Sequence, residues 1–149
     1  MNAASDTLLA LLLALNNLEP PMSAEDNAKL FEIGEQLELD PDDWEFIREG
    51  LMAIIANNPQ LEQQFQMSLN QLATLEEEMK PQLSPTEKEI TQAFDRSSSW
   101  EIRGEDKAEV KTEAIVKIAI KVLKDDQPTK TTKTLNWIKR VDKLVQPDY

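Results

Sequence analysis

The side chains best suited to chemistry in this chain of 149 residues are carboxylates, because it has 28 acidic residues but no histidine and no cysteine. Without these two residue types an enzyme lacks the commonest general base and the most reactive nucleophile. Disulfides and the zinc sites that need sulfur or imidazole are excluded as well. The chemistry that remains is acid–base catalysis by paired carboxylates without a cofactor, for which Asp43 with Glu45 or Glu49 is the candidate.

The densest group of acidic residues, 40–45, differs from a calcium-binding loop. Such a loop places oxygen ligands at alternate positions, glycine at the sixth and glutamate at the twelfth. Counted from Asp40, the second residue is proline, the sixth is Glu45 and the twelfth is Leu51. We therefore expect no metal in this segment, and interpret Asp40-Pro41 as a helix start, with aspartate as the cap and proline in the first turn.

Serine–lysine chemistry and phosphate binding are not supported by any motif. Ser99 and Lys107 stand in no recognisable pattern. The three glycines, Gly34, Gly50 and Gly104, lie too far apart to build a phosphate-binding loop. The sequence therefore predicts a protein that is not an enzyme and that needs no cofactor.

A group of basic and amide residues near the end of the chain could bind a partner. Its members are Lys133, Asn136, Lys139, Arg140 and Lys143. On the second helix of a helix-turn-helix these side chains would suit the phosphates and base edges of a nucleic acid. The preceding turn, however, has aspartates and proline in place of the usual glycine, and the net charge of −12 opposes the approach of a nucleic acid. A lysine face in solvent, or one that meets an acidic protein surface, is the other interpretation.

Three consecutive glutamates, Glu76, Glu77 and Glu78, are the second candidate for contact with a partner. We expect them in the last turn of a helix, where the negative end of the helix dipole makes them unfavourable. Lys80 or a basic partner could offset this cost. If the helix end is simply solvated, the cost is not offset and amounts to roughly a few tenths of a kcal/mol.

The elements that would position these groups are helices. Three glycines are too few for an all-β protein, which needs them repeatedly in its turns. Caps, prolines and the spacing of apolar residues predict an all-α fold of about seven helices. We expect these helices at residues 6–17, 23–39, 41–56, 59–79, 85–95, 106–124 and 131–145.

Three of these helices carry more specific expectations. The first has leucines on nearly all its sides, so it must be buried, either against a partner or, as we expect, at the centre of its own bundle. On the second, Phe31 is expected to face the core. The fifth should begin with a capping box of Ser84 and Glu87, with Pro85 at the first helical position.

Charge divides the chain into two parts. Residues 1–95 carry 19 acidic and four basic side chains, a net charge of −15, whereas residues 96–149 carry nine acidic and 12 basic ones, a net charge of +3. We predict an acidic helical bundle over residues 1–95, a connector over 96–105 anchored by Trp100, and a basic helical hairpin over 106–149. The hairpin either completes the core of the bundle or sits apart from it.

The predicted function is that of a non-enzymatic adaptor or regulatory protein that binds another protein through a helical face. A small nucleic-acid-associated regulator that uses the basic C-terminal helices is the alternative, and an enzyme with paired carboxylates is a third hypothesis. The oppositely charged regions also suggest self-association, which salt at about 1 M would reverse by screening.

We expect a cytoplasmic protein without a membrane segment. The apolar run from Leu8 to Leu15 is far shorter than the ~20 residues that a membrane-spanning helix requires. It also follows Asp6, whereas a secretory signal has basic residues before its apolar stretch.

Overall fold

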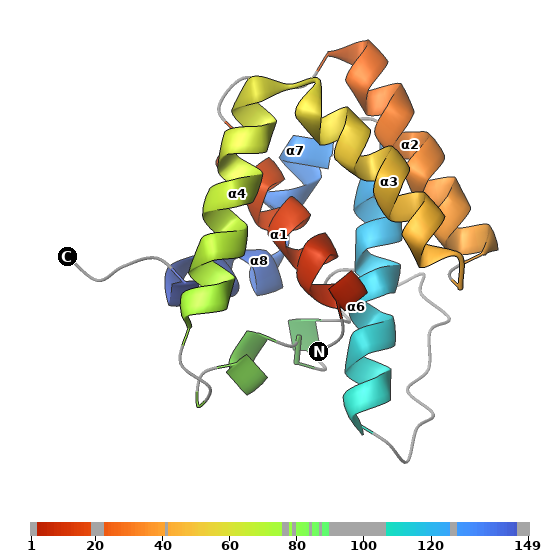
Figure 1. Cartoon of the computed structure of the whole chain (residues 1–149). Helices are drawn as coiled ribbons and strands as arrows, with labels where there is room; N and C mark the ends of the chain where they lie inside the picture. Colours follow the sequence, from red (N-terminus) through yellow and green to blue (C-terminus); the bar gives the residue numbers. More distant parts are fainter. Residues whose placement is uncertain are drawn as a thin grey trace.

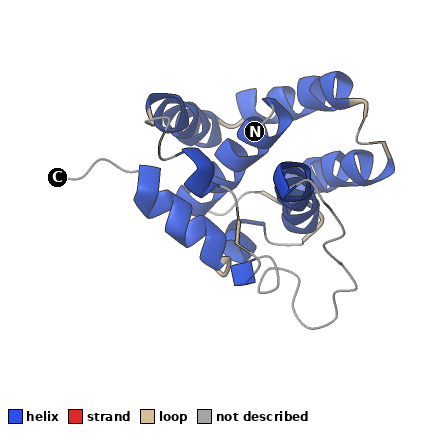
Figure 2. Cartoon of the chain, turned by 90° about the horizontal axis from the view of Figure 1, so that it is seen from below, coloured by secondary structure: helices blue, strands red, loops and turns tan. Residues whose placement is uncertain are grey.

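The chain forms a bundle of helices in the computed structural model (Figures 1 and 2). The structure describes residues 3–18, 23–40, 42–75, 78, 80–83, 85–86, 88–89, 107–125 and 128–145. Within these ranges there are seven α-helices, one short 3-10 helix and no strand, which confirms the all-α prediction. The elements are α1 (Ala3–Asn17), α2 (Ala24–Leu39), α3 (Trp44–Ala56), α4 (Pro59–Thr74), η1 (Lys80–Leu83), α6 (Lys107–Leu123), α7 (Pro128–Thr132) and α8 (Asn136–Val145).

The apolar helix α1 runs through the centre of the bundle (Figure 1). It packs against α4, α6, α7 and α8, and the side chains from Leu8 to Leu15 have no exposed surface. Full burial of a leucine side chain stabilises a fold by about 2 kcal/mol, so each leucine of this stretch contributes substantially to the core. The expectation that this helix fills the centre of its own bundle is confirmed.

Helices from the acidic and the basic parts of the chain pack in one hydrophobic core. Leu30 and Phe65 of the acidic part belong to the same cluster of buried side chains as Ile118 and Val141 of the basic part. Helix α6 contacts both α1 and α2. The predicted connector with its Trp100 lies outside the described residues.

Two glycines allow α2 to approach its neighbours closely. A Cβ on Gly34 would lie 2.8 Å from Cγ of Lys124 and 3.1 Å from Cβ of Leu123, at the end of α6. A Cβ on Gly50 of α3 would lie 3.3 Å from Cδ1 of Ile33. The missing side chains at these two positions let α2 pack against α3 and α6 at once.

Two helices begin within one residue of their predicted starts, each with a side-chain cap. The Ser23 hydroxyl accepts a hydrogen bond from Asp26 N at 3.1 Å, and the Asn58 side chain accepts one from Leu61 N at 3.2 Å. Pro59 follows Asn58 as the first residue of α4. Each cap satisfies a backbone N–H that has no partner inside its own helix.

The predicted helix start at Asp40-Pro41 is wrong. Asp40 is instead the C-cap of α2, and its backbone N–H donates to Gln36 O at 2.9 Å. A residue before proline disfavours the helical conformation, so α2 stops there. A turn closed by Asp43 N and Asp40 O at 3.2 Å follows, and α3 begins at Trp44. Asp43 stands at the N-cap, but its side chain makes no capping hydrogen bond.

Two of the predicted helices have different bounds. Helix α4 ends at Thr74 and not near Met79, and a turn divides the predicted helix 131–145 into α7 and α8. The hydroxyls of Thr132 and Thr134 donate to the backbone carbonyls three residues earlier, at 2.9 and 2.7 Å. Such side-chain bonds compete with helical backbone bonds, which explains the division.

Candidate partner-binding surfaces

The end of α2, the following turn and the start of α3 form a dense group of exposed carboxylates. We call this segment, residues 35–49, the acidic corner; it lies at one side of the bundle (Figure 1). Its acidic residues, all exposed, are Glu35, Glu38, Asp40, Asp42, Asp43, Glu45 and Glu49. Seven acidic residues against one basic residue, Arg48, give the acidic corner a net charge of −6.

Two large apolar side chains stand among these carboxylates. Leu39, the last residue of α2, is 82% exposed, and Phe46, in the first turn of α3, is 60% exposed. The buried stripes of the two helices run through Leu37 and Ile47, and a helix turns by about 100° per residue, so Leu39 and Phe46 fall outside these stripes. Neither side chain contributes to the core.

The expectation that Phe31 faces the core is wrong, because this side chain is 37% exposed. It follows the fully buried Leu30 by one residue, and therefore lies at the edge of the buried stripe of α2. Lys124 covers it from the end of α6, with Nζ 5.9 Å from the centre of the ring. The same ammonium lies 3.1 Å from the Glu38 carboxylate. A lysine from the basic part of the chain thus borders one side of the acidic corner.

The carboxylates considered for catalysis lie in the acidic corner. Glu45 and Glu49 share one face of α3, four residues apart, and Asp43 precedes the helix. All three are exposed, so nothing in their surroundings excludes water from a reaction. Among the described residues, no group of three or more acidic side chains is arranged to hold a metal ion.

The basic group predicted near the end of the chain lies on the outside of α8 and the turn before it. Lys133, Asn136, Lys139 and Lys143 are exposed. The last three share one face of α8, opposite the stripe that α8 buries. That buried stripe consists of Trp137, Ile138, Val141 and Val145. Asn136, Lys139 and Lys143 thus share an exposed face, and Lys133 is exposed in the turn that precedes it.

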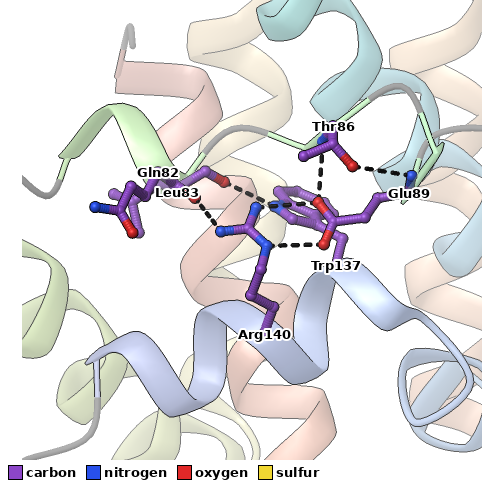
Figure 3. A network of polar contacts seen from close by, with 6 residues as sticks. All are labelled: Gln82, Leu83, Thr86, Glu89, Trp137 and Arg140. Carbon is purple, nitrogen blue, oxygen red and sulfur yellow. Dashed lines mark hydrogen bonds and ion pairs between the residues drawn. The ribbon is translucent and has the colours of Figure 1, made fainter.

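Arg140, the fifth member of that group, is bonded inside the molecule (Figure 3). Its Nε and Nη2 donate to the two carboxylate oxygens of Glu89, at 2.7 and 3.0 Å, and its Nη1 donates to Gln82 O at 2.6 Å. Beside it, Trp137 Nε1 donates to Leu83 O at 2.7 Å. These bonds attach the segment after α4 to α8.

The pKa of Glu89 is lowered despite its partial burial. Burial raises the pKa of this carboxyl, but the hydrogen bonds and charge of Arg140 and the hydrogen bonds from Thr86 lower it by more. Thr86 Oγ1 accepts from Glu89 N at 3.2 Å, and Glu89 Oε1 accepts from Thr86 N at 2.9 Å. The ionised carboxylate therefore joins a helix cap to α8.

This reciprocal pair is a capping box, but not the predicted one. The box is formed by Thr86 and Glu89, two residues later than the expected pair Ser84 and Glu87, which lie outside the described residues. Pro85 is not helical. In this register Glu89 lies within reach of Arg140, so the carboxylate that completes the box also makes an ion pair. The predicted helix beyond Glu89 lies outside the described residues.

The three glutamates after α4 are not the last turn of that helix. Helix α4 ends at Thr74, and Leu75 is its C-cap. The expectation that Glu76–Glu78 form the last turn of this helix is therefore wrong. Glu78 is exposed, and Glu76 and Glu77 lie outside the described residues.

Trp137 is a buried anchor of α8 that the sequence analysis missed. It has no exposed surface and is among the largest fully buried side chains. Its spacing to Val141 and Leu144, four and seven residues on, is helical and would have placed it on the inward stripe.

In the described part of the chain, no helix combines the length and the apolar character that crossing a membrane requires. No protein-family model matches the chain, and neither a curated protein nor a solved structure is significantly similar to it.

Proposed function

We propose that this protein is a non-enzymatic adaptor that binds a basic segment of another protein at the acidic corner. The observation that carries the proposal is the exposure of Leu39 and Phe46, 82% and 60%, beside seven exposed carboxylates. Large apolar side chains left in water next to charge of one sign are typical of an interaction surface.

The two kinds of side chain have different roles in the proposed contact. Leu39 and Phe46 supply affinity, because covering such side chains is favourable by about 1–3 kcal/mol each. The carboxylates speed association and orient the partner, and contribute less to affinity because they remain largely in solvent. The partner segment therefore carries lysines or arginines together with apolar side chains, as an amphipathic basic helix does.

Most carboxylates of the acidic corner make no ion pair with another described residue. Glu38 is paired with Lys124, and the other carboxylates of the corner make no ion pair with a described residue. Asp43 also makes no capping bond. These groups can bond to a partner without first breaking a contact in the free protein.

A fluorescently labelled peptide of 18 residues, with leucine and lysine at helical spacing, tests the proposal by fluorescence anisotropy. We expect binding that weakens as salt rises from 50 to 500 mM, and that falls at least tenfold in the variant Leu39→Ser/Phe46→Ser; tenfold corresponds to about 1.4 kcal/mol.

The matched control is Met67→Ser on α4, which removes a third exposed apolar side chain, 48% exposed, and should leave the affinity unchanged. A second control peptide keeps the lysines but has serine in place of leucine. Equal affinity of the two peptides, or of wild type and the Leu39→Ser/Phe46→Ser variant, would overturn the proposal.

The exposed face of α8 favours a second candidate, a nucleic-acid-associated regulator. Lys139 and Lys143 are exposed on one face of α8, and Lys133 is exposed in the turn before it. Arg140, the side chain best suited to base edges, is bonded to Glu89, and the net charge of −12 remains unfavourable. Binding of a labelled duplex that is lost in Lys139→Glu/Lys143→Glu would place this function first; absence of binding at 50 mM salt would eliminate it.

A further inference from the structure

One carboxylate of the acidic corner differs from the others because it already binds an ammonium group. Lys124, which directly follows α6, places Nζ 3.1 Å from Glu38 Oε1 and 5.9 Å from the centre of the Phe31 ring. A carboxylate and the face of an aromatic ring both attract an ammonium group. We call Phe31, Gly34 and Glu38, the three residues of α2 that Lys124 lies against, the Lys124 site.

Glycine at position 34 makes room for the lysine side chain. Phe31 and Glu38 are seven residues apart and share one face of α2, with Gly34 between them. A Cβ on Gly34 would lie 2.8 Å from Cγ of Lys124, closer than real Cβ atoms approach another carbon. The stem of Lys124 therefore crosses α2 where a side chain is missing, and its ammonium reaches Glu38.

The Lys124 site is accessible from outside the molecule. The side chains of Lys124 and Glu38 are 30% and 55% exposed, and Phe31 is 37% exposed. An ion pair with this exposure is weak, because water solvates both groups when they separate. An ammonium group from another molecule can therefore take the place of Lys124 without disturbing the core.

We propose that a lysine of the basic partner segment replaces Lys124 at this site, so that Lys124 competes with the partner for the acidic corner. This inference rests on the proposed function, which places a basic segment at the corner. The site is continuous with the corner, because the exposed Leu39 directly follows Glu38. The affinity for the partner is lowered by the fraction of molecules in which Lys124 occupies the site.

Fluorescence anisotropy with the labelled leucine–lysine peptide, at 50 mM salt, tests this competition. Lys124→Ala empties the site, so the peptide should bind about threefold to tenfold more tightly than to wild type. The matched control is Lys29→Ala, which removes one positive charge elsewhere on α2, where Lys29 pairs with Glu25. It should change the affinity by less than about twofold, because Lys29 lies outside the site.

A second pair of variants tests whether the gain depends on the Lys124 site. Glu38→Gln/Lys124→Ala removes the carboxylate that would bind the lysine of the peptide, and should lose most of the gain. Glu49→Gln/Lys124→Ala removes an equal charge at an exposed position of α3 and should keep most of it. Thermal unfolding followed by circular dichroism checks that each variant is folded.

The outcomes separate this inference from the proposed function. Peptide binding by wild type with no gain in Lys124→Ala, or with an equal gain in Lys29→Ala, would overturn the competition and leave the proposed function in place. Equal affinities of the two double variants would do the same. Absence of binding to both wild type and Lys124→Ala would overturn the two proposals together.

Discussion

The acidic corner and α8 are both rich in charge, lie on opposite sides of the bundle (Figures 1 and 2), and use their charges differently. On α8, Arg140 is bonded to Glu89, and Asp142 accepts a hydrogen bond from Asn17 Nδ2 at 2.9 Å. In the acidic corner, the ion pair among the described residues is the one between Glu38 and Lys124. Arg140 and Asp142 of α8 thus serve the fold, whereas most charged side chains of the corner make no such contact.

The apolar side chains of the two regions differ in the same way. Trp137 of α8 is fully buried and its indole N–H is satisfied by Leu83 O, but Leu39 and Phe46 are exposed. Helix α8 has partners on both sides, α1 and the segment around residues 82–89, whereas the corner is a turn at the edge of the bundle. The position of a side chain in the bundle, and not its type, therefore decides whether it is buried in the core or left in solvent.

The largest difference between the two regions should appear on truncation of their apolar side chains. Trp137→Ala removes a buried indole and leaves Leu83 O without its donor, so the free energy of unfolding should fall by about 3–5 kcal/mol. Leu39→Ser/Phe46→Ser should change it by less than about 1 kcal/mol, because both side chains face solvent. Urea unfolding followed by circular dichroism measures both. Equal destabilisation of the two variants would show that Leu39 and Phe46 stabilise the fold as much as Trp137 does.

Breaking the pair of Arg140 and Glu89 should have a smaller effect and lower the free energy of unfolding by about 1–2 kcal/mol. Arg140 is 36% exposed and Glu89 12%, so solvent screens the pair in part. Because the pKa of Glu89 is lowered in the folded state, the unfolded chain binds this proton first as the pH falls. The stabilisation is therefore complete above the ordinary pKa of about 4.5 and is lost as the pH falls through the lower, folded value.

Urea unfolding between about pH 7 and pH 3 tests this dependence. Glu89→Gln should unfold more easily than wild type at pH 7, and the difference should shrink toward pH 3. In an Arg140→Ala background the same substitution should have a smaller effect at pH 7, because the main partner of the carboxylate is gone. A difference that is constant over the pH range would show that the charge of Glu89 has no stabilising role.

The smallest effect concerns the two helix caps. Asn58→Ala removes a capping hydrogen bond at the start of α4 and should cost about 1 kcal/mol. Asp43→Ala, at the start of α3, removes a carboxylate without such a bond and should cost less than about 0.5 kcal/mol. In peptide binding the order should be reversed, with a slower association rate for Asp43→Ala only. Equal costs of unfolding would mean that Asp43 serves the fold as Asn58 does.

Local chemistry was sufficient to predict the fold class and much of the core. The caps at Ser23 and Asn58 act between neighbours in the chain, and a helix with leucines on all sides, such as α1, has to be buried in any arrangement. The scarcity of glycine and the helical spacing of apolar residues likewise needed no tertiary information. The exposed lysines at 139 and 143 follow from the same spacing.

Contacts between distant segments decided the rest. The pattern of serine or threonine followed by glutamate occurs at Ser84 and again at Thr86, and only the tertiary structure shows that the glutamate of the second pattern, Glu89, meets Arg140, 51 residues away. The exposure of Phe31, Leu39 and Phe46 depends on which sides of α2 and α3 have a neighbouring helix.

What the sequence by itself determined is therefore where helices form and which of them must be buried, because propensity, capping and apolar periodicity act within a few residues. Which apolar side chains remain outside, and which charges are left for a partner, was decided only when the helices packed. The core has room for a limited set of faces, and a side chain such as Phe46 stays in solvent when no helix lies opposite it.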